Sequence, residues 1–339
     1  MAKKKIEKEG AEAEIAALEK KYGMAKPKLN DLIVVNTGSI QLNMAMKVGG
    51  TVLGKIIEIY GPESSGKSTI MLHQIAEYQQ AFPNKKVALF DYEHSFDPIY
   101  AASIGVDVEA LLIYQPDCQE LGYDMILALI NKELISAAVI DSQTAAIPKA
   151  VRDGEMGDST IALQARNNSK FCLKVKGVLS IHKATLFFVS QTRDRIGGMG
   201  ETTGTTGGNA IKFYADVRWK IWKMNDKIHE SNKTTIDVIK SKVGTPFGCA
   251  KVNILWGKGF DKVGEIVEYA IEFDVMKRGG SWYSYEDVKV GQGMDAVRKT
   301  FDDNPELYEE IYNKVIEKLT PHEENIPEKE TIEKEVQAS

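Results

Sequence analysis

The residues best suited to chemistry form a phosphate-binding loop. Residues 61–69 read GPESSGKST and fit the pattern G-x-x-x-x-G-K-[ST]. Glycines there let backbone N–H groups point at phosphate oxygens, Lys67 would neutralise phosphate charge, and Ser68 would offer a hydroxyl to Mg²⁺. An apolar run at 55–60, expected as a buried strand, precedes the loop, and an expected helix at 70–78 follows it. The pattern needs this strand–loop–helix context, which predicts a nucleotide site.

Three other apolar runs end in residues that could act on a bound triphosphate. Asp141 ends one run, and an acid there commonly holds Mg²⁺, although it is also a common helix cap. Glu93 follows the run at 86–90, and we expect it at the end of a strand beside the loop strand. There it could deprotonate a water, unless it is an ordinary surface Glu. Gln191 ends the run at 185–190, where its amide could contact a γ-phosphate or merely satisfy backbone groups.

Composition points to a soluble, intracellular protein. Of 339 residues, 43% are apolar and 27% are charged, as is ordinary for a globular chain. The three cysteines are far apart, which argues against a disulfide framework or a zinc site. We see no signal peptide or membrane-spanning run and expect a cytoplasmic protein without a membrane partner. The net charge of −5 weakly disfavours nucleic-acid binding, yet residues 166–195 hold seven Lys or Arg against one acid.

The chain is expected to have four parts. Residues 1–31 hold a short helix at 11–22 and a linker, and residues 32–262 alternate strand and helix patterns. Such alternation predicts an α/β core with a mostly parallel sheet, which three closely spaced runs between 216 and 256 would extend as antiparallel strands. Residues 263–320 look like a small α/β domain. The tail at 321–339 is acidic and expected to be disordered.

Two segments are candidates for contact with DNA. Residues 193–209 are rich in Gly and Thr and begin with Arg193 and Arg195, so they predict a mobile loop suited to a phosphodiester backbone. The alternative is a flexible surface loop that does not bind DNA. Residues 152–158 are shorter and more acidic, and they precede the helix that carries Arg166.

Taken together, these motifs closely resemble the bacterial RecA recombinase family. The resemblance rests on GPESSGKST (61–69), DYEHSFDPIYA (91–101), VIDS (139–142), GEMGDS (154–159), TTGGNAIKFYA (205–215) and GGSWYSY (279–285), in the family's order and spacing. It covers residues 11–319. It implies a RecA-like fold and an ATP-dependent filament on single-stranded DNA that searches duplexes for homology and exchanges strands. It also leaves room for loader or single-strand-binding proteins as partners.

The resemblance implies roles for individual residues. Glu93 becomes the hydrolytic base, Gln191 the γ-phosphate sensor, and Lys67 a catalytic cation. The nucleotide would be bound by Gly61, Glu63, Ser64, Ser65, Gly66, Lys67, Ser68, Thr69, Asp97 and Tyr100, with Ser68 and Asp141 on Mg²⁺. DNA would be bound by Arg166, Ser169, Arg193, Arg195, Ile196, Met199, Gly207, Gly208 and Asn209. Phe213 would pack into the neighbouring subunit, and the helix at 11–22 would dock on the adjacent core.

Lys240 and Lys242 are implied to reach the neighbouring subunit's ATP. Their spacing of two in a β-like run places both side chains on one face, where two ammonium groups repel each other unless an anion lies nearby. The alternative is a solvent-facing pair.

Three departures from the family pattern stand out. The loop at 193–209 is one residue shorter than usual and lacks the usual aromatic, so a wedge between bases must come from Ile196 or Met199. Met294 stands where a basic residue is common, and Trp256 replaces a smaller ring on the adenine side. Two other functions share parts of this pattern. A hexameric helicase would use the same core, and a small-molecule kinase would need an acceptor pocket and lid that the sequence does not suggest.

Overall fold

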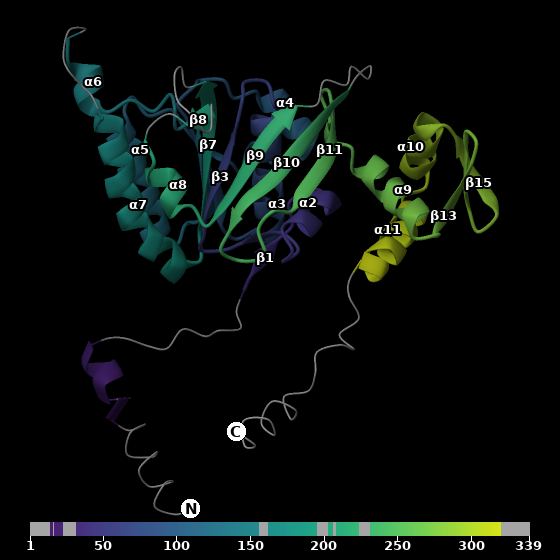
Figure 1. Ribbon diagram of the computed structural model, residues 1–339, viewed down its shortest axis with the longest axis horizontal. Helices are drawn as coiled ribbons and strands as arrows, with labels where there is room; N and C mark the ends of the chain where they lie inside the picture. Colours follow the sequence, from purple (N-terminus) through teal and green to yellow (C-terminus); the bar gives the residue numbers. More distant parts are fainter. Residues whose placement is uncertain are drawn as a thin grey trace, which may run out of the picture. The chain divides into compact units, whose positions relative to one another are not determined.

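Figure 1 shows a computed structural model of the chain, which describes residues 14–15, 17–22, 32–155, 162–194, 203–205, 208–223 and 231–319. Residues 34–339 form one compact unit and residues 1–33 form another. In the smaller unit, residues 17–22 are helical, inside the helix expected at 11–22. The acidic tail predicted at 321–339 lies outside the described residues. Within them, no helix is long and apolar enough to cross a membrane.

A mostly parallel sheet forms the centre of the larger unit (Figure 1). Its strands lie in the order β12-β11-β10-β9-β3-β7-β6-β4-β5, and β8 pairs with β7. They are β3 (Ile56–Gly61), β4 (Lys86–Asp91), β5 (Leu112–Tyr114), β6 (Ile135–Asp141), β7 (Thr185–Asp194), β8 (Thr203–Thr205), β9 (Val217–Lys223), β10 (Ser231–Ser241), β11 (Cys249–Leu255) and β12 (Gly259–Phe260). Strands β9 to β12 pair antiparallel with one another, while β9 joins β3 in parallel. The predicted α/β class is confirmed.

Helices cover both faces of this sheet. On one face lie α2 (Ile40–Ala45), α3 (Lys67–Ala81) and α4 (Pro98–Ile104), and on the other lie α5 (Gln119–Asn131), α7 (Leu163–His182) and α8 (Ala210–Tyr214). Every residue of β6 is buried, as expected for a parallel strand covered on both sides. Three more short elements are the helix α6 (Lys149–Asp153) and the strands β1 (Val34–Val35) and β2 (Thr51–Val52), which pair antiparallel.

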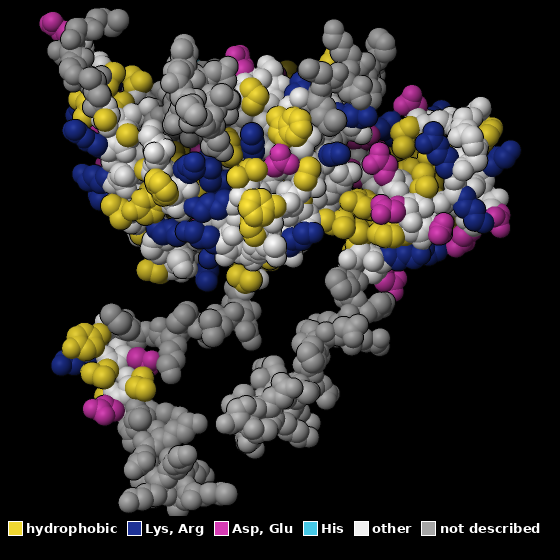
Figure 2. All heavy atoms as spheres, in the orientation of Figure 1, with side chains coloured by type: hydrophobic (Ala, Val, Ile, Leu, Met, Phe, Trp, Pro, Cys, Tyr) yellow, Lys and Arg dark blue, Asp and Glu magenta, His cyan; other side chains and the backbone are white. Residues whose placement is uncertain are grey.

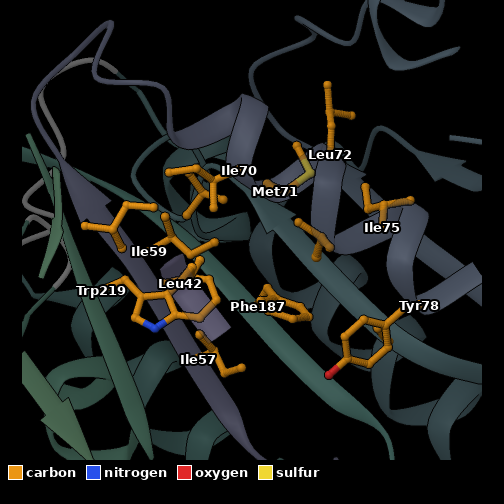
Figure 3. Packing of buried hydrophobic residues seen from close by; sticks show 14 of the residues in the cluster. Leu42, Ile57, Ile59, Ile70, Met71, Leu72, Ile75, Tyr78, Phe187 and Trp219 are labelled. Carbon is orange, nitrogen blue, oxygen red and sulfur yellow. The ribbon is translucent and has the colours of Figure 1, made fainter. Parts of the chain in front are cut away.

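Apolar side chains from α3 and the sheet fix the position of the phosphate-binding loop. Figure 3 shows Ile70 of α3 near Ile59 of β3, with Met71 and Ile75 further along the helix, and all four belong to one apolar cluster. These side chains are nearly or fully buried. Because α3 is packed through its apolar side chains, its first turn is held at the end of β3, where the loop lies.

A small α/β domain follows the sheet. It contains α9 (Lys262–Glu272), an antiparallel sheet of β13 (Met276–Gly279), β14 (Trp282–Tyr285) and β15 (Val288–Gln292), and then α10 (Met294–Asp303) and α11 (Pro305–Leu319). Its own apolar core, which includes Val267, Val297 and Ile311, is separate from the two clusters that flank the large sheet.

One buried carboxylate joins this domain to the core around the large sheet. Glu265 of α9 accepts hydrogen bonds from Ser39 Oγ at 2.7 Å and from the backbone N–H of Ile40 at 2.8 Å, at the start of α2. Only 4% of Glu265 is exposed. Burial raises the pKa of Glu265 from 4.5 to about 7, although the hydrogen bonds from Ser39 and the α2 backbone act against this rise.

We expect Glu265→Gln to change how stability depends on pH. A carboxyl group whose pKa is raised on folding stabilises the fold fully below its unfolded pKa and loses that contribution as pH rises through the folded pKa. The wild type should therefore lose roughly 2–3 kcal/mol between pH 4.5 and 7.5 that the amide variant keeps. Urea unfolding at several pH values measures this. Glu272→Gln, at an exposed position on the same helix, is the control. The prediction would be contradicted if the difference in unfolding free energy between Glu265→Gln and the wild type did not change with pH, as is expected for the control.

Candidate functional site

The phosphate-binding loop joins β3 to α3 as the sequence predicts. Gly66 is in the left-handed region at φ 95° and immediately precedes α3, and no side chain of the described residues caps the helix. Its first N–H groups are therefore open to an anion. Gly61 passes so close to β9 that an added Cβ would lie 2.1 Å from the carbonyl oxygen of Ile221. Lys67 Nζ donates to the carbonyl of Pro62 at 2.6 Å, so the ammonium lies inside the loop.

Acidic groups surround this ammonium. Burial lowers the pKa of Lys67, while Asp141, Glu93 and Glu63 act in the opposite direction. Burial, together with Glu93 and Asp91, raises the pKa of Asp141 to about 7. The structure therefore brings together the predicted cation and the two predicted acids.

The pair predicted to hold Mg²⁺ fits that ion. Ser68 Oγ lies 3.4 Å from Asp141 Oδ2, and the Asp141 carboxylate is buried among other acids, where a cation would relieve their repulsion. Among the described residues there is no group of three or more His, Cys, Asp or Glu side chains suited to a metal.

Glu93 meets two donors at the carboxyl ends of the strands. Its Oε1 accepts from Gln191 Nε2 at 2.9 Å and from the hydroxyl of Ser142. Asp91 shapes the turn that presents Glu93, because its carboxylate accepts from the N–H groups of Glu93, Ser95 and Phe96. The predicted base and the predicted phosphate sensor are therefore in direct contact.

One expectation about Glu93 is wrong. The strand before it, β4, does not lie beside the loop strand β3, since β7 and β6 stand between them. The chain enters these two inner strands only later in the sequence, after it has formed β4 and β5. Glu93 still reaches the site, because parallel strands end at the same edge of the sheet and its neighbours Gln191 and Ser142 lie at the ends of β7 and β6 there.

A cavity of about 350 Å³ adjoins the loop. Its lining includes residues 64–69, Tyr100, Asn232 and Trp256. Tyr100 OH and Thr69 Oγ1 are 2.8 Å apart. Asp97 caps α4, because its Oδ1 accepts from the N–H groups of Ile99 and Tyr100. Its other carboxylate oxygen, Oδ2, would therefore make the predicted contact with adenine. A larger hollow of about 910 Å³ lies in the small domain, and none of its lining residues belongs to the phosphate-binding loop.

The candidate DNA segment at 193–209 ends against α7, the helix that follows the candidate segment at 152–158. A cavity of about 380 Å³ lies there, and its lining includes Val151 of α6, Ala165 near the start of α7, and Gly208. Gly208 packs so closely on α7 that an added Cβ would lie 2.6 Å from the Cβ of Ala165. Arg166 and Ser169 are exposed on α7, three residues apart and so on the same helical face, and Asn209 is exposed beside Gly208. Figure 2 shows Lys and Arg side chains gathered over α7 and α8.

Part of the predicted mobile loop is a β-ladder. Strand β7 continues to Asp194, and β8 pairs with it so that Thr192 faces Thr205 and Arg193 faces Gly204. Polar, Thr-rich backbone can pair in this way without contributing to a core. The predicted contacts Arg195, Ile196, Met199 and Gly207 lie outside the described residues, as does the segment 156–161.

Lys240 contacts its own subunit. Its Nζ donates to the carbonyls of Lys212 and Phe213, each at 2.9 Å, and so caps the C-terminus of α8. Phe213 itself is 67% exposed. Burial and the neighbouring Lys242 lower the pKa of Lys240. Lys242 lies just beyond β10, which is shifted by a bulge between Val238 and Lys240.

Two residues of this site escaped the sequence reasoning. Ser142 contacts Glu93, and the hydroxyl of Thr144 accepts from the N–H of Gln191 at 3.3 Å. The signal available for Ser142 was its place directly after Asp141 at a strand end, a position also typical of a helix cap. Neither contact is local in sequence, so pattern alone could not reveal the partners.

Comparison with known proteins agrees with this geometry. Residues 1–261 match the family model of the RecA N-terminal domain, and residues 264–320 match that of the RecA C-terminal domain. The chain is 43% identical over 318 residues to "Protein RecA" of Cytophaga hutchinsonii, which covers 90% of this chain and 89% of that protein. It is 43% identical over 320 residues to "Protein RecA" of Bacteroides thetaiotaomicron, covering 91% and 96%, and 41% identical to that of Ruminococcus albus, covering 91% and 80%.

Proposed function

The chain belongs to the RecA family, and from this membership we infer that it is an ATP-dependent recombination protein. It forms a helical filament on single-stranded DNA, pairs that strand with a homologous duplex and exchanges strands, and DNA stimulates its ATP hydrolysis. The observation that best supports this function is the contact between Glu93 and Gln191. It joins the proposed hydrolytic base to β7, the strand that leads directly into the proposed DNA-binding segment.

The proposed division of labour follows the geometry of the site. Backbone N–H groups at the start of α3 and Lys67 bind the phosphates, and Glu93 accepts a proton from the attacking water. Ser68 and Asp141 hold Mg²⁺, which when bound supplies positive charge to the phosphate oxygens. Gln191 turns toward the γ-phosphate and so reports its presence to β7. Asp97, Tyr100 and Trp256 surround the adenine.

The proposal also covers the roles of the chain's segments, the location of the protein and its partners. Residues 1–31 dock on a neighbouring core, 32–262 bind ATP and DNA, 263–320 form the small domain, and 321–339 are an acidic tail. Phe213 packs into the adjacent subunit. The protein works in the cytoplasm, and loader or single-strand-binding proteins assist it.

One pair of measurements tests the function. ATP hydrolysis by the purified protein should rise on adding single-stranded DNA. Electron microscopy with DNA and a non-hydrolysable ATP analogue should reveal helical filaments. Closed rings would favour a hexameric helicase. Phosphorylation of a small molecule without any response to DNA would favour a kinase.

Binding to single-stranded DNA should weaken with salt and tolerate any sequence, because charge and backbone donors carry it. Arg193→Ala/Arg195→Ala should lower affinity and reduce the slope of log affinity against log salt by roughly 0.7 for each phosphate that the variant no longer neutralises. Fluorescence anisotropy over a salt series measures both. Lys86→Ala/Lys132→Ala is the control, since both lysines are exposed at the opposite edge of the sheet. If the two double variants show the same slope of log affinity against log salt concentration, DNA binds at a site other than Arg193 and Arg195.

Mixing two inactive variants should restore hydrolysis if the active site is shared. Lys67→Ala lacks the phosphate-binding ammonium, and Lys240→Ala/Lys242→Ala lacks the lysines proposed to act in trans. A shared site is active only where a subunit with an intact phosphate loop lies next to one with intact lysines. If the two variants are mixed in equal amounts and assemble at random, about a quarter of the sites meet both conditions, so about a quarter of wild-type activity should return. Mixtures that form joint filaments yet stay inactive at every ratio would refute the shared site.

A further inference from the structure

Ser142 has an unusual position at the candidate active site. It follows β6, between the strand that leads to Glu93 and the strand that carries Gln191. Its hydroxyl donates to Glu93 Oε1, the oxygen that also accepts from Gln191 Nε2. Within the described part of the chain, no hydrogen bond to Glu93 Oε2 is present. One oxygen of the carboxylate is therefore held twice, and the other is left for a water.

The two donors differ in how firmly they are placed. Ser142 is only 1% exposed. Its backbone is fixed on both sides, because Tyr92 N–H donates to the carbonyl of Asp141 at 2.7 Å and Gln143 N–H donates to the carbonyl of Val189 at 2.9 Å. Gln191 is partly exposed and belongs to the strand that continues into the β8 ladder.

We propose that Ser142 is a positioning residue that holds the Glu93 carboxylate in its reactive orientation. This inference rests on the proposed role of Glu93 as the base. When Gln191 turns to the γ-phosphate, Glu93 loses one of its two donors and would be free to rotate. The buried hydroxyl of Ser142 then remains as the fixed contact, and it keeps Oε2 directed at the water from which Glu93 takes a proton. Ser142 itself exchanges no proton with substrate.

The test compares Ser142→Ala with Ser142→Thr, which keeps the hydroxyl. Ser142→Ala should lower kcat for ATP hydrolysis on single-stranded DNA roughly 10- to 100-fold, because misplacing a catalytic group by about 1 Å costs that much. Its KM for ATP, its Mg²⁺ requirement and its DNA binding with a non-hydrolysable analogue should change by less than about twofold. Ser142→Thr should recover most of kcat. Ser136→Ala removes another buried serine hydroxyl from β6, at the far end of the strand, and is the matched control.

A second comparison separates positioning from a general structural effect. In single-turnover hydrolysis, adding Ser142→Ala to Glu93→Gln should cause no further loss, since no base remains to be positioned. An equal loss in both backgrounds would overturn the proposal. So would wild-type kcat in Ser142→Ala, or a matching loss of analogue-supported DNA binding. Failure of DNA to stimulate the wild type would instead count against the proposed function, and the Ser142 comparison could still be made without DNA.

Discussion

Replacing Lys67 with Ala should reduce DNA-stimulated ATP hydrolysis by at least ~10²–10³-fold, the loss typical of removing one key electrostatic contact to a transition state. The structure gives a specific reason. Lys67 is the cation at the centre of a site that also holds Asp141, Glu93 and Glu63. Without its ammonium, these acids would repel the triphosphate, and the developing charge on the γ-phosphate would have no fixed counter-charge.

The measurement is the steady-state hydrolysis rate with saturating single-stranded DNA, alongside binding of a fluorescent ATP analogue. Lys85→Ala removes a lysine from the opposite edge of the sheet, just before β4, and should behave as the wild type. Thermal unfolding shows whether the Lys67 variant is folded. Hydrolysis within about tenfold of wild type by a folded Lys67→Ala would remove the loop from the mechanism.

Glu93→Gln should bind ATP but lose hydrolysis by ~10²–10⁴-fold, the usual contribution of a general base. The amide oxygen can still accept hydrogen bonds from Ser142 and Gln191, so the site keeps its shape. It cannot accept a proton from water. ATP should therefore persist on the protein, and filaments on DNA should outlive those of the wild type.

Filament lifetime after dilution and the rate of phosphate release together check this result. Glu109→Gln makes the same chemical change at an exposed position before β5, and should leave both quantities unchanged. Should Glu93→Gln hydrolyse ATP at the wild-type rate, another group must activate the water. Loss of nucleotide binding would instead assign Glu93 a structural part.

The sequence predicted the elements well because their signals are local. Short apolar runs located β3, β4, β6 and β7, and the phosphate loop marked the start of α3. Strand order is a different matter. It depends on which faces the crossover helices cover, and no local pattern encodes that, so Glu93 was expected beside β3.

Contacts between distant residues were equally hidden. Glu265 and Ser39 lie 226 residues apart in the chain, and Ser142 and Glu93 lie 49 apart. A serine or a glutamate carries no sign of its partner until the fold brings them together. The residue pattern left the roles of Glu93 and Gln191 open, and family resemblance chose among the alternatives for them and for Lys240 and Lys242. These roles remain predictions that the variants above can decide.

The contact between Lys240 and α8 has a consequence for any polymer of this protein. One ammonium group cannot remain at 2.9 Å from two carbonyls of its own subunit and also reach a phosphate on the next. Each subunit whose Lys240 engages a neighbour must therefore release the carbonyls of Lys212 and Phe213 at the end of its own α8. A subunit at the terminus, with no neighbour for its lysine, keeps these two hydrogen bonds. A filament built in this way contains two kinds of α8, and the last subunit is chemically distinct from all the others.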